Sequence, residues 1–196
     1  DKDWPAALND LGDRAPYLLW TRGATSFLTR ALSDRVTFTG ARASTSYGEH
    51  VTGELVTGVA DEERIVVTGG AYGIEGAAHR GALAAGGQTV AVLAGGLDRP
   101  YPAGHSELLN QIGELGLLAS EVPRGSAPAR PRFIARNRLP AGLLAHADIA
   151  EKRHHHLDRQ HEERGRDDDD AGAVRPLDDV LEALVDVGED RLGRHE

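Results

Sequence analysis

The sequence predicts an α/β fold, a parallel sheet with helices on both faces. Short apolar runs alternate with helical segments, and the runs lack the polar alternation of strands that have one face in water. Three of these runs, at residues 36–39, 65–68 and 89–93, each end in a glycine-rich loop. Because the carboxyl ends of parallel strands meet at one edge, we expect the three loops to lie together.

The first two strands are each followed by a recognisable helix. After the strand at 36–39 the pattern predicts a helix over 47–60, because Ser46 and Glu49 have the spacing of a capping box. After the strand at 65–68 a helix is expected over 74–85, with small residues that allow close packing on the sheet and a Gly-Gly pair that ends it.

The third strand, at 89–93, leads to a helix predicted over 105–114. A fourth strand follows at 117–120, and a further one begins at 147–149. No repeat of fixed period is present, so the chain is expected to form a single α/β domain with short appendages.

Composition excludes several classes of protein. The 196 residues contain no cysteine, which excludes disulfides and thiolate metal sites. No apolar run approaches the roughly 20 residues that span a bilayer, and no signal peptide is recognisable, so we expect a cytoplasmic protein without a membrane partner. The chain starts at Asp1 and has no methionine, which predicts a fragment or a processed chain.

The net charge of −9 is distributed unevenly along the chain. Residues 1–149 hold 14 Lys or Arg and 16 Asp or Glu, whereas residues 150–196 hold 8 and 15. Between residues 122 and 147 there are five arginines and no acidic residue. Such a patch can bind phosphates despite the negative total, because charges beyond a Debye length of about 8 Å are largely screened.

The loop that follows the second strand, Gly69-Gly70-Ala71-Tyr72-Gly73, is a candidate phosphate-binding element. Glycine lets the backbone approach an anion at a helix N-terminus. The loop matches neither the dinucleotide fingerprint nor the Walker loop. Tight turns and close helix packing are the alternative explanation for its glycines.

The arginine-rich stretch at 130–138 contains one aromatic residue, Phe133. Guanidinium groups bind phosphates and an exposed ring stacks on bases, so the pattern suits single-stranded nucleic acid. The alternative is that Phe133 belongs to the core and the arginines form a solvated face.

Several linked motifs resemble the DNA-processing protein A (DprA, or Smf) family across roughly residues 4–147. They are Thr39-Gly40-Ala41-Arg42, Thr68-Gly69-Gly70-Ala71-Tyr72-Gly73-Ile74-Glu75, Ala78-His79-Arg80-Gly81-Ala82-Leu83, Gly95-Gly96-Leu97-Asp98, Tyr101-Pro102, Ser120-Glu121, Phe133, Arg136-Asn137-Arg138 and Ala141-Gly142-Leu143. The resemblance implies a bacterial, Rossmann-like protein that binds and protects single-stranded DNA in natural transformation and helps to load the RecA recombinase. It also implies the possibility of a homodimer.

Carried over to this sequence, the resemblance implies a DNA-binding site with a phosphate pocket, a stacking residue and no catalytic centre, cofactor or metal. Phe133 is the stacking candidate and Asn137 has a bridging or loop-holding role. The expected DNA-binding residues are Gly40, Arg42, Gly69, Gly70, Gly73, Arg130, Phe133, Arg136, Asn137 and Arg138.

The chain departs from the family pattern in two places. Glu75 stands where the family usually has Asp, and after residue 149 the expected further strands are replaced by a polar stretch. We therefore expect a lead-in segment at 1–30, a Rossmann-like DNA-binding domain at 31–149, a disordered acidic and His-rich segment at 150–173, and an amphipathic helix with a tail at 174–196. A rearranged, frame-shifted or degenerate homologue is the hypothesis that this loss of apolar pattern suggests.

Two other functions fit parts of the sequence. A Rossmann-like hydrolase of the phosphoribohydrolase type would need a carboxylate at the loops, for which Glu75, Asp98 and Glu121 are the candidates. The histidines of the tail, at 154–156 and 161, could bind zinc or nickel adventitiously, but they do not form the zinc-protease motif. A solvated polar tail is the simpler interpretation.

Overall fold

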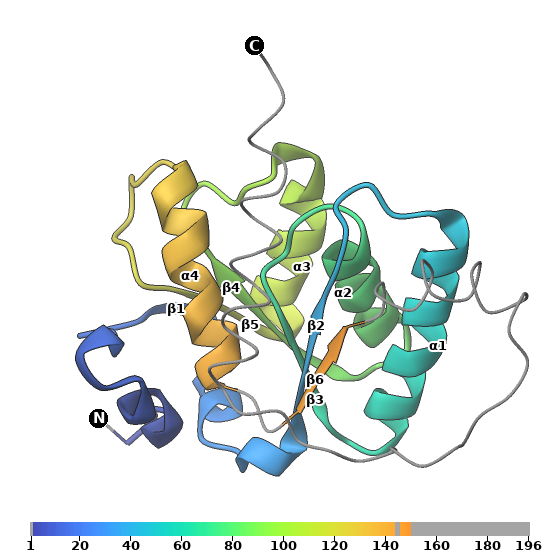
Figure 1. The fold of residues 1–196 in the computed structure, drawn as a ribbon, viewed down its shortest axis with the longest axis horizontal. Coiled ribbons are helices and arrows are strands. Elements are labelled where there is room, and N and C mark those ends of the chain that lie inside the picture. Colours follow the sequence, from blue (N-terminus) through green and yellow to red (C-terminus); the bar gives the residue numbers. More distant parts are fainter. Residues whose placement is uncertain (1, 144–145, 150–196) are drawn as a thin grey trace, which may run out of the picture.

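The computed structural model describes residues 2–143 and 146–149. It contains a six-stranded sheet in the order β1-β5-β4-β3-β2-β6, in which β1 runs antiparallel to β5 and all other neighbours are parallel (Figure 1). The strands are β1 (Trp20–Gly23), β2 (Arg35–Thr39), β3 (Ile65–Thr68), β4 (Gln88–Leu93), β5 (Leu117–Ser120) and β6 (His146–Ile149). The predicted α/β class is confirmed.

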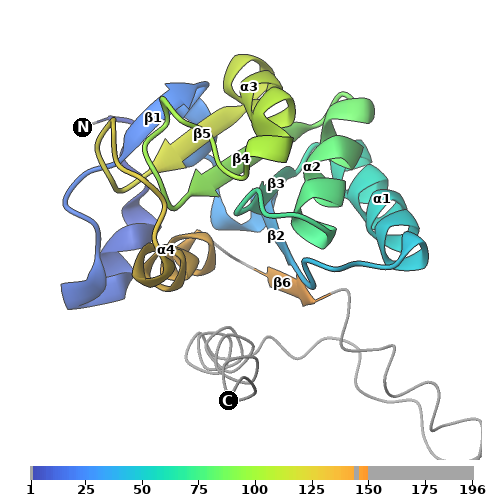
Figure 2. The ribbon, with the colours of Figure 1, turned by 90° about the horizontal axis from the view of Figure 1, so that it is seen from above.

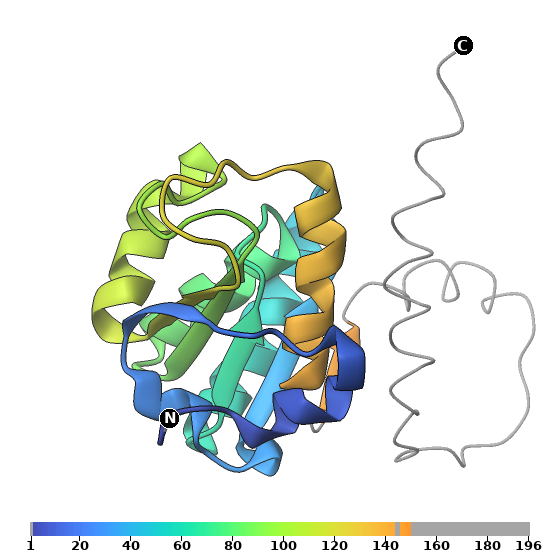
Figure 3. The same cartoon turned by 90° about the vertical axis from the view of Figure 1, so that its left-hand side faces the viewer.

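Helices cover both faces of the sheet. α1 (Ser46–Asp61), α2 (Ile74–Ala84) and α3 (Ser106–Leu115) lie on one face, and α4 (Arg130–Gly142) lies on the other together with the 3₁₀ segment η1 (Ala6–Arg14) (Figures 2 and 3). Shorter 3₁₀ turns are η2 (Thr25–Leu28), η3 (Leu32–Asp34) and η4 (Ala103–His105).

The two faces of the central strands supply two cores. Ile65 and Val67 of β3 pack with Leu139 of α4 and Leu8 of η1, whereas Val66 between them packs with Ala78 of α2 on the opposite face. Successive side chains of a strand point to opposite faces, and here both faces are buried. This double burial explains why β3 has no polar alternation.

Most predicted elements are found within one or two residues of their expected bounds, and β3 and β5 coincide with them. The capping prediction at α1 was wrong by one residue. Thr45, not Ser46, caps the helix by accepting a hydrogen bond from Gly48 N (3.1 Å), while the Ser44 hydroxyl donates to Glu49 (2.6 Å). The preceding hydroxyls bind the helix start, which leaves Ser46 as the first helical residue.

The N-terminal part contributes to the same sheet and core. β1 pairs with β5, and Leu8, Leu11 and Leu28 are buried beneath the sheet. The segments predicted at 150–173 and 174–196, the tail histidines and the hypothesis of a replaced half-sheet lie outside the described residues. Among the helices that are described, none combines the length and the apolar character that crossing a bilayer requires.

His79 of α2 is fully buried between the helix and the sheet. Its Nδ1 lies 2.8 Å from the Thr89 hydroxyl, which itself donates to the Val66 carbonyl (3.1 Å), so Nδ1 carries the proton and Nε2 is left without a partner in the described part of the chain. Burial, reinforced by the nearby His105, Arg136 and Arg80, lowers the pKa of His79 to about 3.

The low pKa of His79 makes the stability of the fold depend on pH. The unfolded chain takes up a proton near pH 6.5 and the folded chain does not, so stability is complete above that pH and falls as the pH drops toward 3. Between pH 7.5 and pH 5 the unsubstituted protein should lose about 2 kcal/mol of its free energy of unfolding through His79. We expect the His79→Asn protein, which keeps a donor for Thr89, not to show this loss. Urea unfolding of both proteins at the two pH values measures the free energies of unfolding. Equal losses in the two proteins would contradict the assignment of this pH dependence to His79.

Candidate nucleic-acid interface

The glycine loops lie together at the carboxyl edge of the parallel strands, the upper end of the sheet in Figure 1. The first two loops are locked to each other. Gly73 has φ +73°, and a Cβ on it would lie 2.1 Å from the Ala41 carbonyl oxygen, while Ile74 N donates to that same oxygen (3.3 Å). Only glycine allows this approach, so the close packing of the two loops requires glycine at position 73. A Cβ on Gly40 would lie 2.7 Å from the Ile74 side chain.

Arg136 is buried directly beneath the second loop and has 6% of its surface exposed. A Cβ on Gly69 would lie 1.3 Å from Arg136 Nη1, so the guanidinium lies flat against the backbone of the loop. Nη1 donates to the Val92 carbonyl of β4 (2.9 Å). We expected Arg136 to line a phosphate pocket; the structure places it under the loop, where it joins α4 to the sheet.

Glu75 supports this loop together with Arg136. Its Oε2 accepts from Ala71 N (2.9 Å) and lies 4.0 Å from Arg136 Nη1. Burial lowers the pKa of the Arg136 guanidinium, Glu75 opposes that shift and Arg42 adds to it. Glu75 therefore shapes the loop and offsets a buried cation.

Arg138 is also taken up by contacts within the protein. Its Nη2 donates to Glu121 Oε1, its Nε to the Arg14 carbonyl (2.7 Å) and its Nη1 to the Ala135 carbonyl. These bonds tie α4 to η1 and to the end of β5. Asn137 is half-buried beside it.

A solvent-facing cluster of Arg42, Phe133 and Tyr101 stands above the buried arginine. The Arg42 guanidinium carbon lies 5.4 Å from the centre of the Phe133 ring, and the Tyr101 ring lies 5.7 Å from Phe133 at an angle of 59°. Three different loops or helices supply the three side chains. We did not predict Tyr101 as a site residue, although its place in the third glycine-rich loop was a usable signal.

Further arginines line the same edge. Arg130 opens α4, and within the described residues neither its side chain nor that of Arg42 has a hydrogen bond or ion pair. Arg99 and Arg124 flank Asp98. Arg132 donates to the Ala127 carbonyl (2.6 Å). The exposed charge of this edge is therefore predominantly positive.

Asp98 holds the loop that leads into α4. Its Oδ1 accepts from Gly125 N (2.9 Å), and Gly96 N donates to the Ser126 carbonyl (2.9 Å). The Gly125 hydrogen bond, with Arg124 and Arg99, lowers the pKa of the Asp98 carboxyl. Glu75, Asp98 and Glu121, the three carboxylates considered for hydrolysis, all bind a backbone N–H or an arginine.

His105 and Tyr72 hold the second loop at its far end. His105 Nδ1 lies 3.2 Å from the Gly70 carbonyl, and its ring packs edge-on against Tyr72 (4.7 Å between centroids). Tyr72 accepts a bond from Gly104 N (3.2 Å) and stays about half exposed. In the part of the chain that the structure describes, no group of three or more His, Asp or Glu side chains could hold a metal ion.

The sequence profile of the DNA recombination-mediator protein A family matches residues 1–154. This chain belongs to that family. It is 48% identical over 161 residues to the DNA processing protein DprA of Mycobacterium tuberculosis, covering 77% of this chain and 41% of that protein. It is 36% identical over 151 residues to DprA of Streptococcus pneumoniae, covering 77% and 52%. The chain thus spans about half the length, or less, of these relatives.

Solved structures of the family share the fold. The crystal structure of DprA from Streptococcus pneumoniae superposes with a TM-score of 0.72 at 32% identity, covering 96% of this chain and 67% of that one. DprA from Helicobacter pylori, described for its single-stranded DNA binding mode, superposes with a TM-score of 0.69 at 24% identity, covering 93% of each chain.

The contact between the first two loops can be tested with two glycines that share a positive φ. Gly73→Ala would place a methyl group against the Ala41 carbonyl, whereas Gly125 (φ +80°) has nothing within 4 Å of the added carbon. We expect Gly125→Ala to cost about 1 kcal/mol of unfolding free energy and Gly73→Ala to cost at least about 2 kcal/mol more. Urea denaturation measures both; equal costs would show that the two loops do not depend on this contact.

Proposed function

We propose that the carboxyl edge of the sheet binds single-stranded DNA. The observation that carries the proposal is the cluster of Arg42, Phe133 and Tyr101. In it Arg42, which has no acidic partner among the described residues, lies over the Phe133 ring, and the half-exposed Tyr101 ring lies beside it. Aromatic faces stack on unpaired bases, and guanidinium groups bind the phosphates between them. A duplex keeps its bases paired and offers no such faces.

The distribution of exposed aromatic residues supports the same edge. In the described part of the chain five aromatic side chains are prominently exposed: Tyr17, Trp20, Tyr47, Tyr72 and Tyr101. Four of the five belong to segments at this edge, since α1 starts there with Tyr47, Tyr72 and Tyr101 lie in the glycine-rich loops, and Trp20 pairs with Ser120 at the carboxyl end of β5. A strand of DNA that crosses the edge would meet several stacking faces.

The buried residues would act as supports for this surface. Arg136 and Glu75 shape the Gly69–Gly73 loop from below, and Arg138 fixes α4, which carries Phe133 and Arg130. Direct contacts to DNA are proposed for Arg42, Arg130, Phe133 and Tyr101, and for the backbone of Gly40, Gly69, Gly70 and Gly73. Asn137, half-buried on α4, would hold the loops.

Relatives support the broader role. The Helicobacter pylori structure is described for its single-stranded DNA binding mode, and the Mycobacterium tuberculosis and Streptococcus pneumoniae relatives are named as DNA processing proteins. We propose that this chain takes part in DNA processing in the bacterial cytoplasm as a binding protein without a catalytic centre, protecting single strands and assisting RecA, with a homodimer as a further expectation. The partners of the three edge carboxylates favour binding over hydrolysis.

Substitution of Arg42 tests whether the proposed site binds DNA phosphates through charge. Labelled oligo-thymidine is titrated by fluorescence anisotropy at several salt concentrations, with a duplex as the comparison. We expect Arg42→Ala to weaken single-strand binding several-fold and to reduce the slope of log affinity against log salt by about 0.7, the contribution of one phosphate. Arg30→Ala, an exposed arginine paired with Asp34, is the matched control and should change neither quantity. An Arg42 variant with unchanged slope would remove Arg42 from the site, and a duplex bound equally well would contradict the proposal.

Stacking is tested separately on α4. Phe133→Leu keeps an apolar side chain but loses the ring, so we expect an affinity loss of about 1 to 3 kcal/mol with the salt slope unchanged. Ile134→Ala removes an exposed apolar side chain from the neighbouring position and should leave the affinity as it was. The same anisotropy titration decides; equal losses in the two variants would indicate a general effect on α4 and contradict a stacking role.

A further inference from the structure

A second buried arginine lies at the opposite end of the sheet. Arg35 is the first residue of β2 and is 3% exposed. Its Nη2 donates to the carbonyl oxygens of Leu28 and Arg30, both at 2.6 Å. Nε and Nη1 are buried and have no hydrogen-bond partner among residues 2–143 and 146–149. A guanidinium has five N–H donors, so three of them are unsatisfied.

No acidic side chain of the described residues makes an ion pair with Arg35. Its neighbour Asp34 is 3.0 Å from Arg30 Nε, to which it is paired. The charge of Asp34 acts on Arg35 at a distance, but the three buried donors stay unsatisfied. A buried donor without an acceptor is costly, and proteins normally supply an acceptor at such a place. The acceptor for Arg35 is therefore expected from outside the described side chains.

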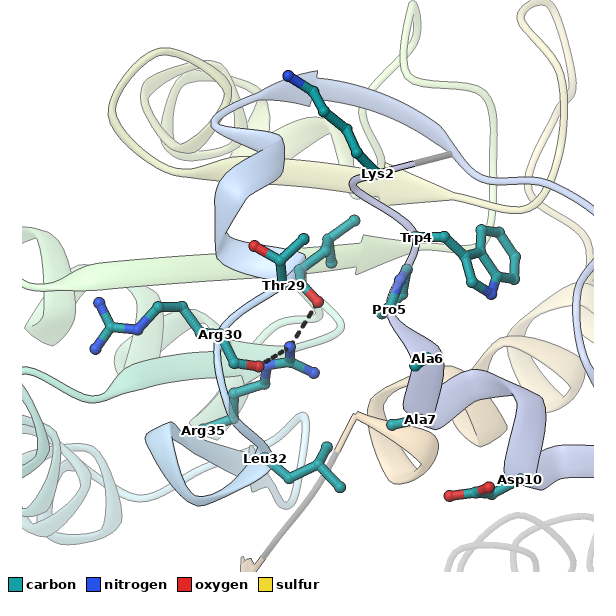
Figure 4. Close-up of a pocket in the computed structure, with 11 residues that line it drawn as sticks. Lys2, Trp4, Pro5, Ala6, Ala7, Asp10, Thr29, Arg30, Leu32 and Arg35 are labelled. Atoms are coloured by element: carbon teal, nitrogen blue, oxygen red, sulfur yellow. Dashed lines mark hydrogen bonds between the residues drawn. The ribbon is translucent and has the colours of Figure 1, made fainter.

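A cavity of about 490 Å³ adjoins Arg35. In Figure 4 the end of the guanidinium that makes no hydrogen bond points toward the segment of Ala6 and Ala7. Trp4, Leu28 and Leu32 supply apolar walls, and Lys2 and Arg30 add positive charge. Asp10 also lines the cavity, at the end away from Arg35 (Figure 4). The volume is in the range of sites for small molecules.

We propose that this cavity binds a small organic anion, whose phosphate or carboxylate oxygens accept hydrogen bonds from Arg35 and whose apolar body packs against Trp4 and Leu32. The site is separate from the proposed DNA edge, because β2 runs from Arg35 to Thr39 and a strand of five residues places its ends about 13 Å apart. The unsatisfied donors select the charged group, and the apolar walls select the rest of the ligand.

Trp4 provides a direct readout. The chain has two tryptophans, and Trp20 lies at the other end of the sheet, so the Trp20→Phe protein reports from Trp4 alone. Phenyl phosphate and benzoate are titrated at constant ionic strength, with benzyl alcohol as the neutral counterpart. We expect saturable changes in Trp4 fluorescence with at least one anion, at concentrations at least tenfold below any effect of the alcohol. The tighter of the two anions identifies the head group. An equal response to the alcohol, or none to either anion, would overturn the proposal.

Two pairs of variants locate the anion. Arg35→Lys should weaken binding at least tenfold, whereas Arg30→Lys, which changes a cavity arginine already paired with Asp34, should change it less than twofold.

If Arg35→Lys does not fold, Ala7→Glu keeps Arg35 and introduces a carboxylate into the cavity, with Ala7→Gln as the control of equal size. We expect Ala7→Glu to abolish the anion response and to melt at a higher temperature than Ala7→Gln. Identical behaviour of the Glu and Gln proteins would contradict an anion site at Arg35.

Discussion

The burial of Arg136 beneath the second glycine loop is the constraint on which the proposed binding edge depends. The guanidinium joins three elements, because it touches the backbone at Gly69, donates to Val92 of β4 and belongs to α4. A side chain at position 69 would occupy the same space. The loop can therefore take this path only with glycine above and arginine below, and the position of α4 fixes where Phe133 meets Arg42.

Elements buried on both faces were predicted best from the sequence. β3 and β5 are short apolar runs bounded by turn residues, and their observed limits equal the predicted ones. β1 was not predicted as a strand, because Trp20-Thr21-Arg22-Gly23 has neither an apolar run nor a regular alternation. It becomes a strand only through pairing with β5, a contact of distant sequence that local pattern does not contain.

In the candidate site, too, some residues were predicted from the sequence and others were not. Arg42 and Phe133 were predicted, and the structure brings them together from separate elements. The pattern did not separate arginines that face solvent from those that face the protein, since Arg130 and Arg136 look alike in a basic stretch. Their difference arises from the helical turn of α4, which places Arg130 at its exposed start and Arg136 over the sheet. Tyr101 was missed because its role depends on the approach of α4 to the third loop.

The two buried arginines of the described residues differ in how their charge and donors are met. Arg136 has a carbonyl acceptor and a carboxylate within 4.0 Å and stabilises a loop, although its Nε also has no hydrogen-bond partner among the described residues. Arg35 has two carbonyl acceptors for one nitrogen and none for the other two, next to a cavity. Buried guanidinium groups tolerate such a deficit poorly, because desolvation is offset only by acceptors that are present. The nearby Glu75 carboxylate and the packing against Gly69 therefore give Arg136 a structural role, whereas Arg35 touches a cavity and no carboxylate of the described residues, and there we propose a ligand.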